Sequence, residues 1–156
     1  MEQLVDSAAF SAWATRLTRP FNFTSPFDRR DFALLLFVGG EAVTADERNA
    51  ISKAVVAGGC RYAVCAGSDC SSWDDAIDWA YIATDPKDDS AFVMTTWHEE
   101  QPIEEVAEFL VFSATYERLG DPPPRRYLVA CIGDEAAYVA ARDAVREQLR
   151  LRSGQQ

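Results

Sequence analysis

One cysteine and the single histidine of the chain lie where side chains could carry out chemistry. Cys70 precedes an expected helix, and a helix N-terminus stabilises a thiolate. His98 follows an expected strand, and its imidazole could take the thiol proton. Asp69 or Glu41 could orient the ring, which would complete a nucleophile, a base and an orienting acid. No family spacing supports this arrangement, so incidental polar residues at strand ends are the competing interpretation.

The other motifs that could hold a metal or a cofactor are absent from the sequence. Cys60, Cys65 and Cys131 lie in apolar runs and are interpreted as small buried side chains. The C-x4-C-x4-C spacing differs from that of zinc sites, and one histidine cannot supply the missing ligands. The chain has no G-x-G-x-x-G, no G-x4-G-K-[ST] and no G-x-S-x-G. We expect no metal and no cofactor, although scattered carboxylates leave metal coordination open.

A regular alternation of strands and helices must position these residues. Apolar runs predict strands over 32–38, 61–66, 91–96 and 126–132. Capping boxes at Thr44 and Ser72 predict helices that end near residues 58 and 83. Pro102 begins a third expected helix that ends near Arg118, and a fourth follows Asp134. Residues 7–18 carry apolar side chains at helical spacing and predict one more helix in front.

This alternation is typical of an α/β domain with helices on both faces of a parallel sheet. The simplest arrangement is a four-stranded, flavodoxin-like sheet in the order 2-1-3-4. We expect residues 1–31 to form the N-terminal helix and a crossing segment packed on the domain. Residues 32–152 would then be the single α/β domain, and residues 153–156 a frayed tail. Ligands of such sheets bind beyond the carboxyl ends of the strands, where Glu41, Asp69, Cys70 and His98 are expected.

The charge of the chain is concentrated in its middle third. The net charge is −10, and residues 62–117 hold 13 acids against one base, Lys87. Such a surface repels a phosphate backbone, so we expect no nucleic-acid partner. It would attract a basic protein and raise the encounter rate. Solubility alone is the competing interpretation, because acidic proteins are common.

The predicted topology gathers these acids on one side of the molecule. In the order 2-1-3-4, right-handed crossovers place the second and third helices on the same face and the last helix with the first. We therefore expect an acidic face that binds a basic partner, and a mixed to basic back. Acids scattered over both faces would leave solubility as the explanation. The expected partner-binding residues are Asp74, Asp75, Asp78, Trp79, Glu100, Glu104, Glu105 and Glu108.

These observations predict a non-enzymatic protein-binding domain of the immunity or antitoxin kind. The alternative is a small hydrolase or transferase that uses Cys70 and His98. The longest apolar run has seven residues, from Phe32 to Val38, so no membrane segment is expected. The first residues lack the pattern of a secretion signal, which favours the cytoplasm. Thirteen arginines against two lysines indicate a GC-rich bacterial source.

Overall fold

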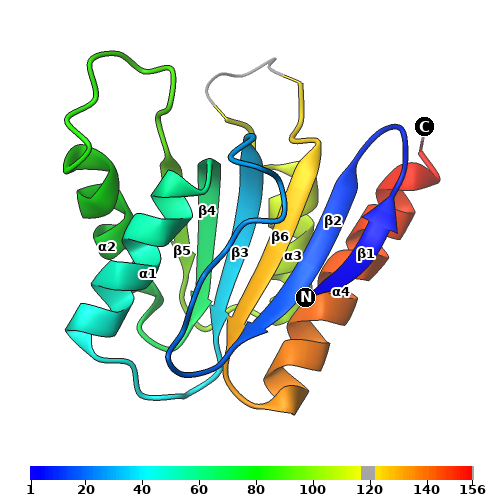
Figure 1. Cartoon of the computed structure of the whole chain (residues 1–156). Helices are drawn as coiled ribbons and strands as arrows, with labels where there is room; N and C mark the ends of the chain where they lie inside the picture. The colour runs from blue at the N-terminus through cyan, green and yellow to red at the C-terminus, as the bar shows by residue number, and fades with distance from the viewer. Residues whose placement is uncertain (117–121, 156) are drawn as a thin grey trace.

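A single mixed sheet organises the computed structural model, which describes residues 1–116 and 122–155. Six strands within those ranges form the sheet in the order β1-β2-β6-β3-β4-β5 (Figure 1). β1 is antiparallel to β2, and all other neighbours are parallel. The strands are β1 Glu2–Asp6, β2 Ser11–Leu17, β3 Phe32–Val38, β4 Cys60–Gly67, β5 Met94–His98 and β6 Arg126–Ile132.

The centre of the sheet confirms the expected α/β class. Nearly every residue of β3, β4 and β6 is buried, because helices cover both faces of these strands. The uninterrupted apolar runs correctly predicted this environment. β5 begins at Met94, not at residue 91. A turn in which Phe92 N donates to Asp89 O takes up the residues before it.

The helices are α1 Ala45–Ala57, α2 Cys70–Ile82, α3 Ile103–Phe112 and α4 Glu135–Ser153. The capping box of α1 is confirmed, since Thr44 and Glu47 each accept a hydrogen bond from the other's backbone. The second predicted capping box is wrong. α2 already begins at Cys70, so Ser72 lies inside the first turn. α3 ends at Phe112, and the predicted end near Arg118 lies outside the described residues.

The predicted strand order is wrong. Numbered along the chain, the four predicted strands lie in the order 3-2-1-4, as β5-β4-β3-β6. The chain therefore advances in one direction across the sheet through β3, α1, β4, α2 and β5. α3 then crosses back over the sheet to β6. Right-handed crossovers place α1 and α2 on one face and α3 on the other. α3 packs against α4 there (Figure 1).

The N-terminal segment is also different from the prediction, which placed a helix at residues 7–18. It forms β1 and β2, and β2 extends the sheet beside β6 in parallel register, from Ser11 opposite Arg126 to Leu17 opposite Ile132. Pairing with an otherwise open edge of β6 outweighs the helical preference of the alanines. Phe21, Phe23 and Phe27 are buried in the segment that then crosses to β3.

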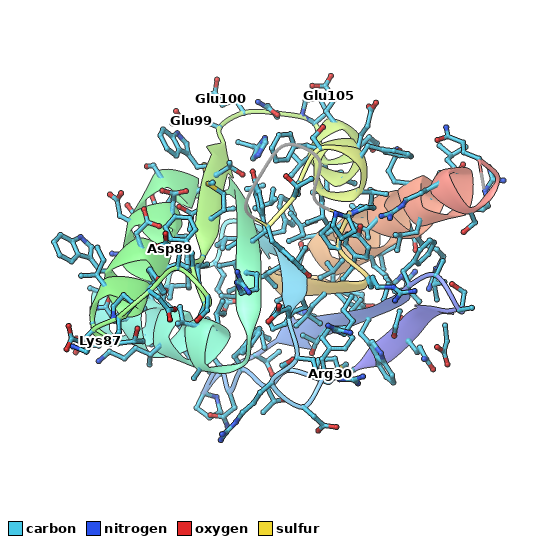
Figure 2. The ribbon with its side chains drawn as sticks, turned by 90° about the horizontal axis from the view of Figure 1, so that it is seen from above. Arg30, Lys87, Asp89, Glu99, Glu100 and Glu105 are labelled. Atoms are coloured by element: carbon cyan, nitrogen blue, oxygen red, sulfur yellow. The ribbon has the colours of Figure 1, made fainter. Side chains whose placement is uncertain are left out.

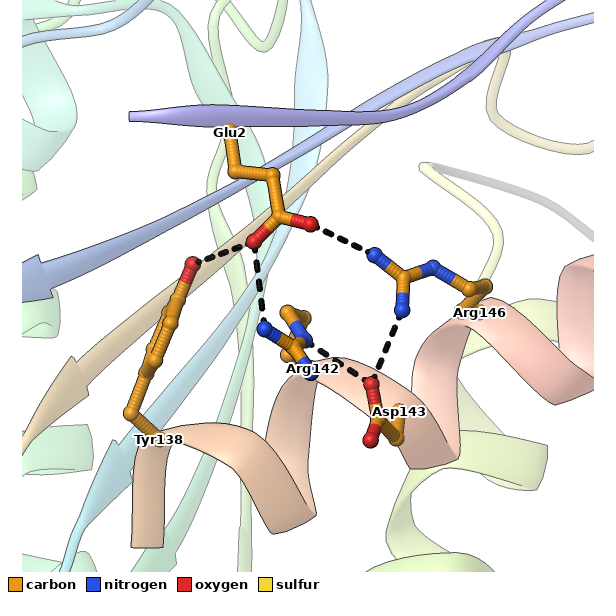
Figure 3. A network of polar contacts seen from close by, with 5 residues as sticks. All are labelled: Glu2, Tyr138, Arg142, Asp143 and Arg146. Carbon is orange, nitrogen blue, oxygen red and sulfur yellow. Dashed lines mark hydrogen bonds and ion pairs between the residues drawn. The ribbon is translucent and has the colours of Figure 1, made fainter. Parts of the chain in front are cut away.

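A network of charged groups attaches β1 to α4 (Figure 3). Glu2 accepts hydrogen bonds from Tyr138 Oη at 3.2 Å, Arg142 Nη1 at 3.3 Å and Arg146 Nη2 at 2.7 Å. Asp143 accepts from the same two arginines. These ion pairs neutralise Arg142 and Arg146, so α4 contributes less free positive charge than the expected mixed to basic back implied.

Two apolar layers, one on each face of the sheet, make the core. Leu34, Leu36 and Trp73 belong to the layer under α1 and α2. Leu35, Val129 and Leu110 belong to the layer under α3 and α4. No helix in the described ranges is both long enough and apolar enough to span a membrane.

Candidate functional site

The point where the strand order reverses lies between β3 and β6, and the chain packs closely just beyond these strands. In open parallel sheets, ligands bind at this point, beyond the carboxyl ends of the strands. Here Gly39 and Gly133 approach each other, and a Cβ on Gly39 would lie 2.7 Å from the Cβ of Ala137 at the start of α4. Gly39 therefore serves close packing between the end of β3 and α4, whereas Gly40 provides the positive φ of the following turn.

Cys70 is a core residue at the start of α2. Its side chain joins the apolar layer beneath α1 and α2, and 3% of the residue is exposed. Burial raises the pKa of the Cys70 thiol, and the nearby Glu99 carboxylate raises it further. Hydrogen bonds from backbone groups, including that of His98, oppose these effects without cancelling them. The helix start does not produce the thiolate that the sequence suggested.

The His98 ring lies on the other face of the sheet. It stacks against Phe109 of α3 with 4.7 Å between ring centroids. Nε2 lies 3.1 Å from Thr96 Oγ1, and Nδ1 lies 3.0 Å from Gln101 Oε1. Both ring nitrogens are therefore engaged by neighbours on β5 and on the loop that follows it. The residue is 7% exposed.

The two carboxylates expected to orient the imidazole are engaged elsewhere or point away. Glu41 forms an ion pair with Arg19 at 2.9 Å. Asp69 is exposed and adopts the left-handed conformation, with φ of 54°, at the start of α2. Across the part of the chain that the structure describes, no hydrogen bond links either of them, or Cys70, to the His98 ring. The geometry gives the Cys70/His98 arrangement no support.

The predicted acidic face is wrong as well, because α2 and α3 lie on opposite faces of the sheet. Each face combines one acidic helix with one that carries bases: α2 with α1, and α3 with α4. The acids are thus distributed over both faces. Charge alone therefore no longer favours docking over solubility.

The eight predicted partner-binding residues divide into separate environments. Asp74 is buried, and Asp78 accepts a hydrogen bond from Thr95 of β5. Asp75 and Trp79 line hollows between α1 and α2. The remaining four, Glu100, Glu104, Glu105 and Glu108, are exposed in the loop after β5 and on α3.

Asp74 is a carboxyl held inside the α2/β5 contact. The residue is 4% exposed, and its Oδ1 has no hydrogen-bond partner within the described chain. Burial raises the pKa of Asp74, and the carboxylates of Asp78 and Asp75 add to the increase, whereas a hydrogen bond with Thr95 lowers it. No group of three or more metal-binding side chains gathers around it or elsewhere in the residues described.

Acids from α2, from the loop after β5 and from α3 lie toward the edge of the sheet that β5 forms. β5 is the last strand and pairs only with β4 among the described strands. Glu99 and Glu100 follow this strand, and Glu105 lies over α3 on the same margin of the molecule (Figure 2). Asp78 approaches from the other face through its bond with Thr95. We call Asp78, Trp97, Glu99, Glu100 and Glu105 the acidic edge.

Trp97 is the apolar member of the acidic edge. It is 55% exposed although it belongs to a strand of the sheet. Side chains alternate along a strand, so Trp97 shares the α2 side of β5 with Thr95. The sequence analysis missed this residue and its strand's edge position. The signal was present, because Thr95 and Thr96 interrupt the apolar run that the central strands maintain.

Trp79 stands apart, in a groove between the outer surfaces of α1 and α2. The groove has a volume of about 380 Å³ and a floor that includes Ala76, Ala80 and Ala83. Trp79 is 68% exposed at its wall. Asp75 lines a neighbouring hollow that also includes Arg48 and Trp79, so we do not count it in the acidic edge.

Comparisons with known proteins give a family for the chain. No curated protein and no solved structure matches it. Residues 12–148, from the start of β2 into α4, match the family described as "Domain of unknown function (DUF7684)". The match covers all five parallel strands and therefore the acidic edge. The chain belongs to this DUF7684 family.

Proposed function

We propose that the chain is a non-enzymatic binding domain that docks a basic protein at the acidic edge. Immunity and antitoxin proteins of the bacterial cytoplasm work in this way, by covering a basic partner. The observation that carries the proposal is Trp97, an exposed tryptophan on an open edge strand that the unpaired acids Glu99 and Glu100 follow in sequence.

The first support is that the acidic edge lacks neutralising bases. None of Asp78, Glu99, Glu100 and Glu105 forms an ion pair with another described residue. Six acids elsewhere, Glu2, Glu41, Glu47, Glu135, Asp143 and Glu147, pair with arginines, whereas others such as Asp6 and Asp28 have no ion pair within the described residues. Uncompensated charge of one sign raises the rate at which an oppositely charged partner associates.

The second support is the exposed indole. Tryptophan is enriched among the residues that dominate binding energy at protein interfaces. An indole face also attracts lysine and arginine side chains, by about 0.5–1 kcal/mol at exposed sites. Trp97 can therefore contribute apolar burial and a cation contact to the same basic partner that the carboxylates attract.

The third support is the backbone of β5. Natural proteins commonly protect open strands with lysine, proline or a covering segment. Residues 94–98 contain neither lysine nor proline. An extended segment of the partner can add to β5 by backbone hydrogen bonds, while its basic side chains reach the carboxylates on either side.

The test compares variants of the immobilised chain exposed to proteins of the native host at low and at high salt. We expect one basic protein to bind, with association slowed about tenfold or more by Glu99→Lys combined with Glu105→Lys. Trp97→Ala should release it faster. Asp6→Lys is the matched control, because Asp6 is an exposed acid on β1, at the opposite edge of the sheet.

Three results would overturn the proposal. The acidic-edge variants could retain the same proteins as the parent chain. The control could lose them equally, which would indicate an effect of total charge alone. Finally, the experiment could find no host protein that binds the parent chain in preference to the variants. Circular dichroism of each variant establishes that the fold is retained.

The enzyme alternative has its own measurement. Because Cys70 is buried and its pKa is raised, iodoacetamide at neutral pH should label it more slowly than a free thiol. Mass spectrometry of the modified peptide gives the rate. Labelling of Cys70 much faster than free cysteine would favour the hydrolase or transferase hypothesis over docking.

A further inference from the structure

Three arginines surround a hollow at the amino ends of neighbouring strands, away from the acidic edge. The hollow has a volume of about 220 Å³ and is lined by Arg30, Arg125, Arg126, Ser7, Ser11 and the turn at 8–10. β2, β6 and β3 are adjacent, and Ser11 lies opposite Arg126 in the register of β2 and β6. The strand order thus brings together bases that are about a hundred residues apart in the sequence.

The backbone holds each of the three guanidinium groups in place. Arg30 Nε donates to Phe27 O at 3.0 Å, and Arg126 Nε donates to Asp31 O at 2.6 Å. Arg125 makes longer bonds of 3.4 Å to the carbonyl oxygens of Ala8 and Ala9. The terminal nitrogens of Arg30 and Arg126 have no hydrogen-bond partner in the described part of the chain.

Among the described residues, no carboxylate neutralises these groups. Neither Arg30 nor Arg125 nor Arg126 forms an ion pair with any residue in 1–116 or 122–155. The nearby carboxylate of Asp31 pairs with Arg61 at 3.1 Å. In a chain with a net charge of −10, this cluster of bases without carboxylate partners calls for an explanation. Like charges repel one another, so the arrangement has a cost unless an anion offsets it.

We infer that the hollow binds the phosphate group of a small ligand. Guanidinium groups match phosphate oxygens with paired hydrogen bonds, and anchoring through Nε leaves the terminal nitrogens directed for that contact. Ser11 supplies a hydroxyl without a hydrogen-bond partner among the described residues. The small volume and the overall negative charge favour a small phosphorylated molecule over a nucleic acid.

This site is independent of the proposed docking surface. Arg30 lies on the margin of the molecule opposite Glu99, Glu100 and Glu105 (Figure 2). The hollow also lies at the amino ends of the strands, whereas Glu99 and Glu100 follow the carboxyl end of β5. Phosphate binding and partner docking can therefore be gained or lost separately.

The test is a titration of the full chain with inorganic phosphate at constant ionic strength, followed by NMR of the arginine Nε–H groups. We expect saturable shifts at Arg30, Arg125 and Arg126. Arg30→Gln or Arg125→Gln should weaken binding about tenfold. Arg125→Lys keeps the positive charge but loses the paired N–H donors of the guanidinium group, so it should also weaken phosphate binding. Arg29→Gln is the matched control, since Arg29 is exposed, adjacent in sequence and outside the hollow.

Several outcomes would overturn the inference. Chloride at the same ionic strength could produce equal shifts, which would indicate screening alone. Arg29→Gln could weaken binding as much as Arg125→Gln. A short DNA duplex, titrated in parallel, could bind more tightly than phosphate, which would replace the small ligand by a nucleic acid.

Discussion

The carboxyl of Asp74 makes stability depend on pH in the direction opposite to most surface acids. Because its pKa is raised in the folded protein, the folded state binds this proton more tightly than the unfolded state. Its destabilising effect is absent below the unfolded pKa, near 3.9, and is fully present above the raised pKa. The carboxylate therefore weakens the fold at neutral pH.

Replacing Asp74 with asparagine should accordingly stabilise the protein at pH 7 by about 1 kcal/mol, because an amide carries no charge into the α2/β5 contact. The gain should shrink as the pH approaches 4. Urea unfolding at the two pH values measures both effects. Asp75→Asn, an exposed neighbour, should change little. A loss of stability for Asp74→Asn at pH 7 would show that the ionised carboxylate is needed.

Gly40 and Gly67 allow the cost of a left-handed backbone conformation to be measured apart from the cost of close packing. Gly67 and Gly40 have nearly the same φ, +84° and +85°. A Cβ on Gly67 would lie 2.1 Å from Val38 O, whereas nothing lies within 4 Å of a Cβ on Gly40. Gly40→Ala should cost about 1 kcal/mol, for conformation alone. Gly67→Ala should lower the free energy of unfolding by about 3 kcal/mol or more. Equal losses for the two variants in urea unfolding would contradict the close contact at Gly67.

At the residue scale, the sequence predicts which side chains lie near strand ends, but not on which face of the sheet each one lies. Cys70 does follow β4, and His98 is the last residue of the neighbouring strand, β5. Which face each side chain takes depends on the exact residue at which the strand or helix begins. α2 starts two residues before the predicted cap, and β5 starts three residues late. Such shifts move side chains between the layers of the molecule.

At the scale of elements, the two capping sequences offer a direct comparison. Thr44 closes a reciprocal box at the start of α1. Ser72 has the same spacing to an acid but lies inside α2. Thr44→Ala should lower the free energy of unfolding by about 1 kcal/mol, and Ser72→Ala should change it by less than about 0.5 kcal/mol. A larger loss for Ser72→Ala would mean that α2 begins at the predicted cap.

β2 shows why one predicted helix became a strand. Phe10, Trp13 and Leu17 have helical spacing, and alanine is a strong helix former. In the folded chain Phe10 contributes to the layer under α3 and α4, whereas Trp13 and Leu17 face the other layer. The spacing of these apolar residues is compatible with both a helix and a strand. The vacant edge of β6, a long-range feature, decides between them.

At the scale of the whole molecule, strand order controls where charge accumulates. Strand composition correctly predicted that the four expected strands are parallel, although the complete sheet is mixed. The order of the strands depends on which strand lies at the edge, and composition does not determine that. Placing β5 at the end puts α2 and α3 on opposite faces, so their acids do not form one face. The overall charge of the middle third was evident in the sequence, but the surface that it creates was not.

Hydrogen exchange on the chain bound to its basic partner tests the central claim most directly. Docking at the acidic edge predicts slower exchange of the β5 amides, Met94–His98, and of the loop at 99–101. Amides of β1, at the other edge of the sheet, should exchange as in the free chain. Protection confined to β1 and α4, with β5 unchanged, would contradict the account.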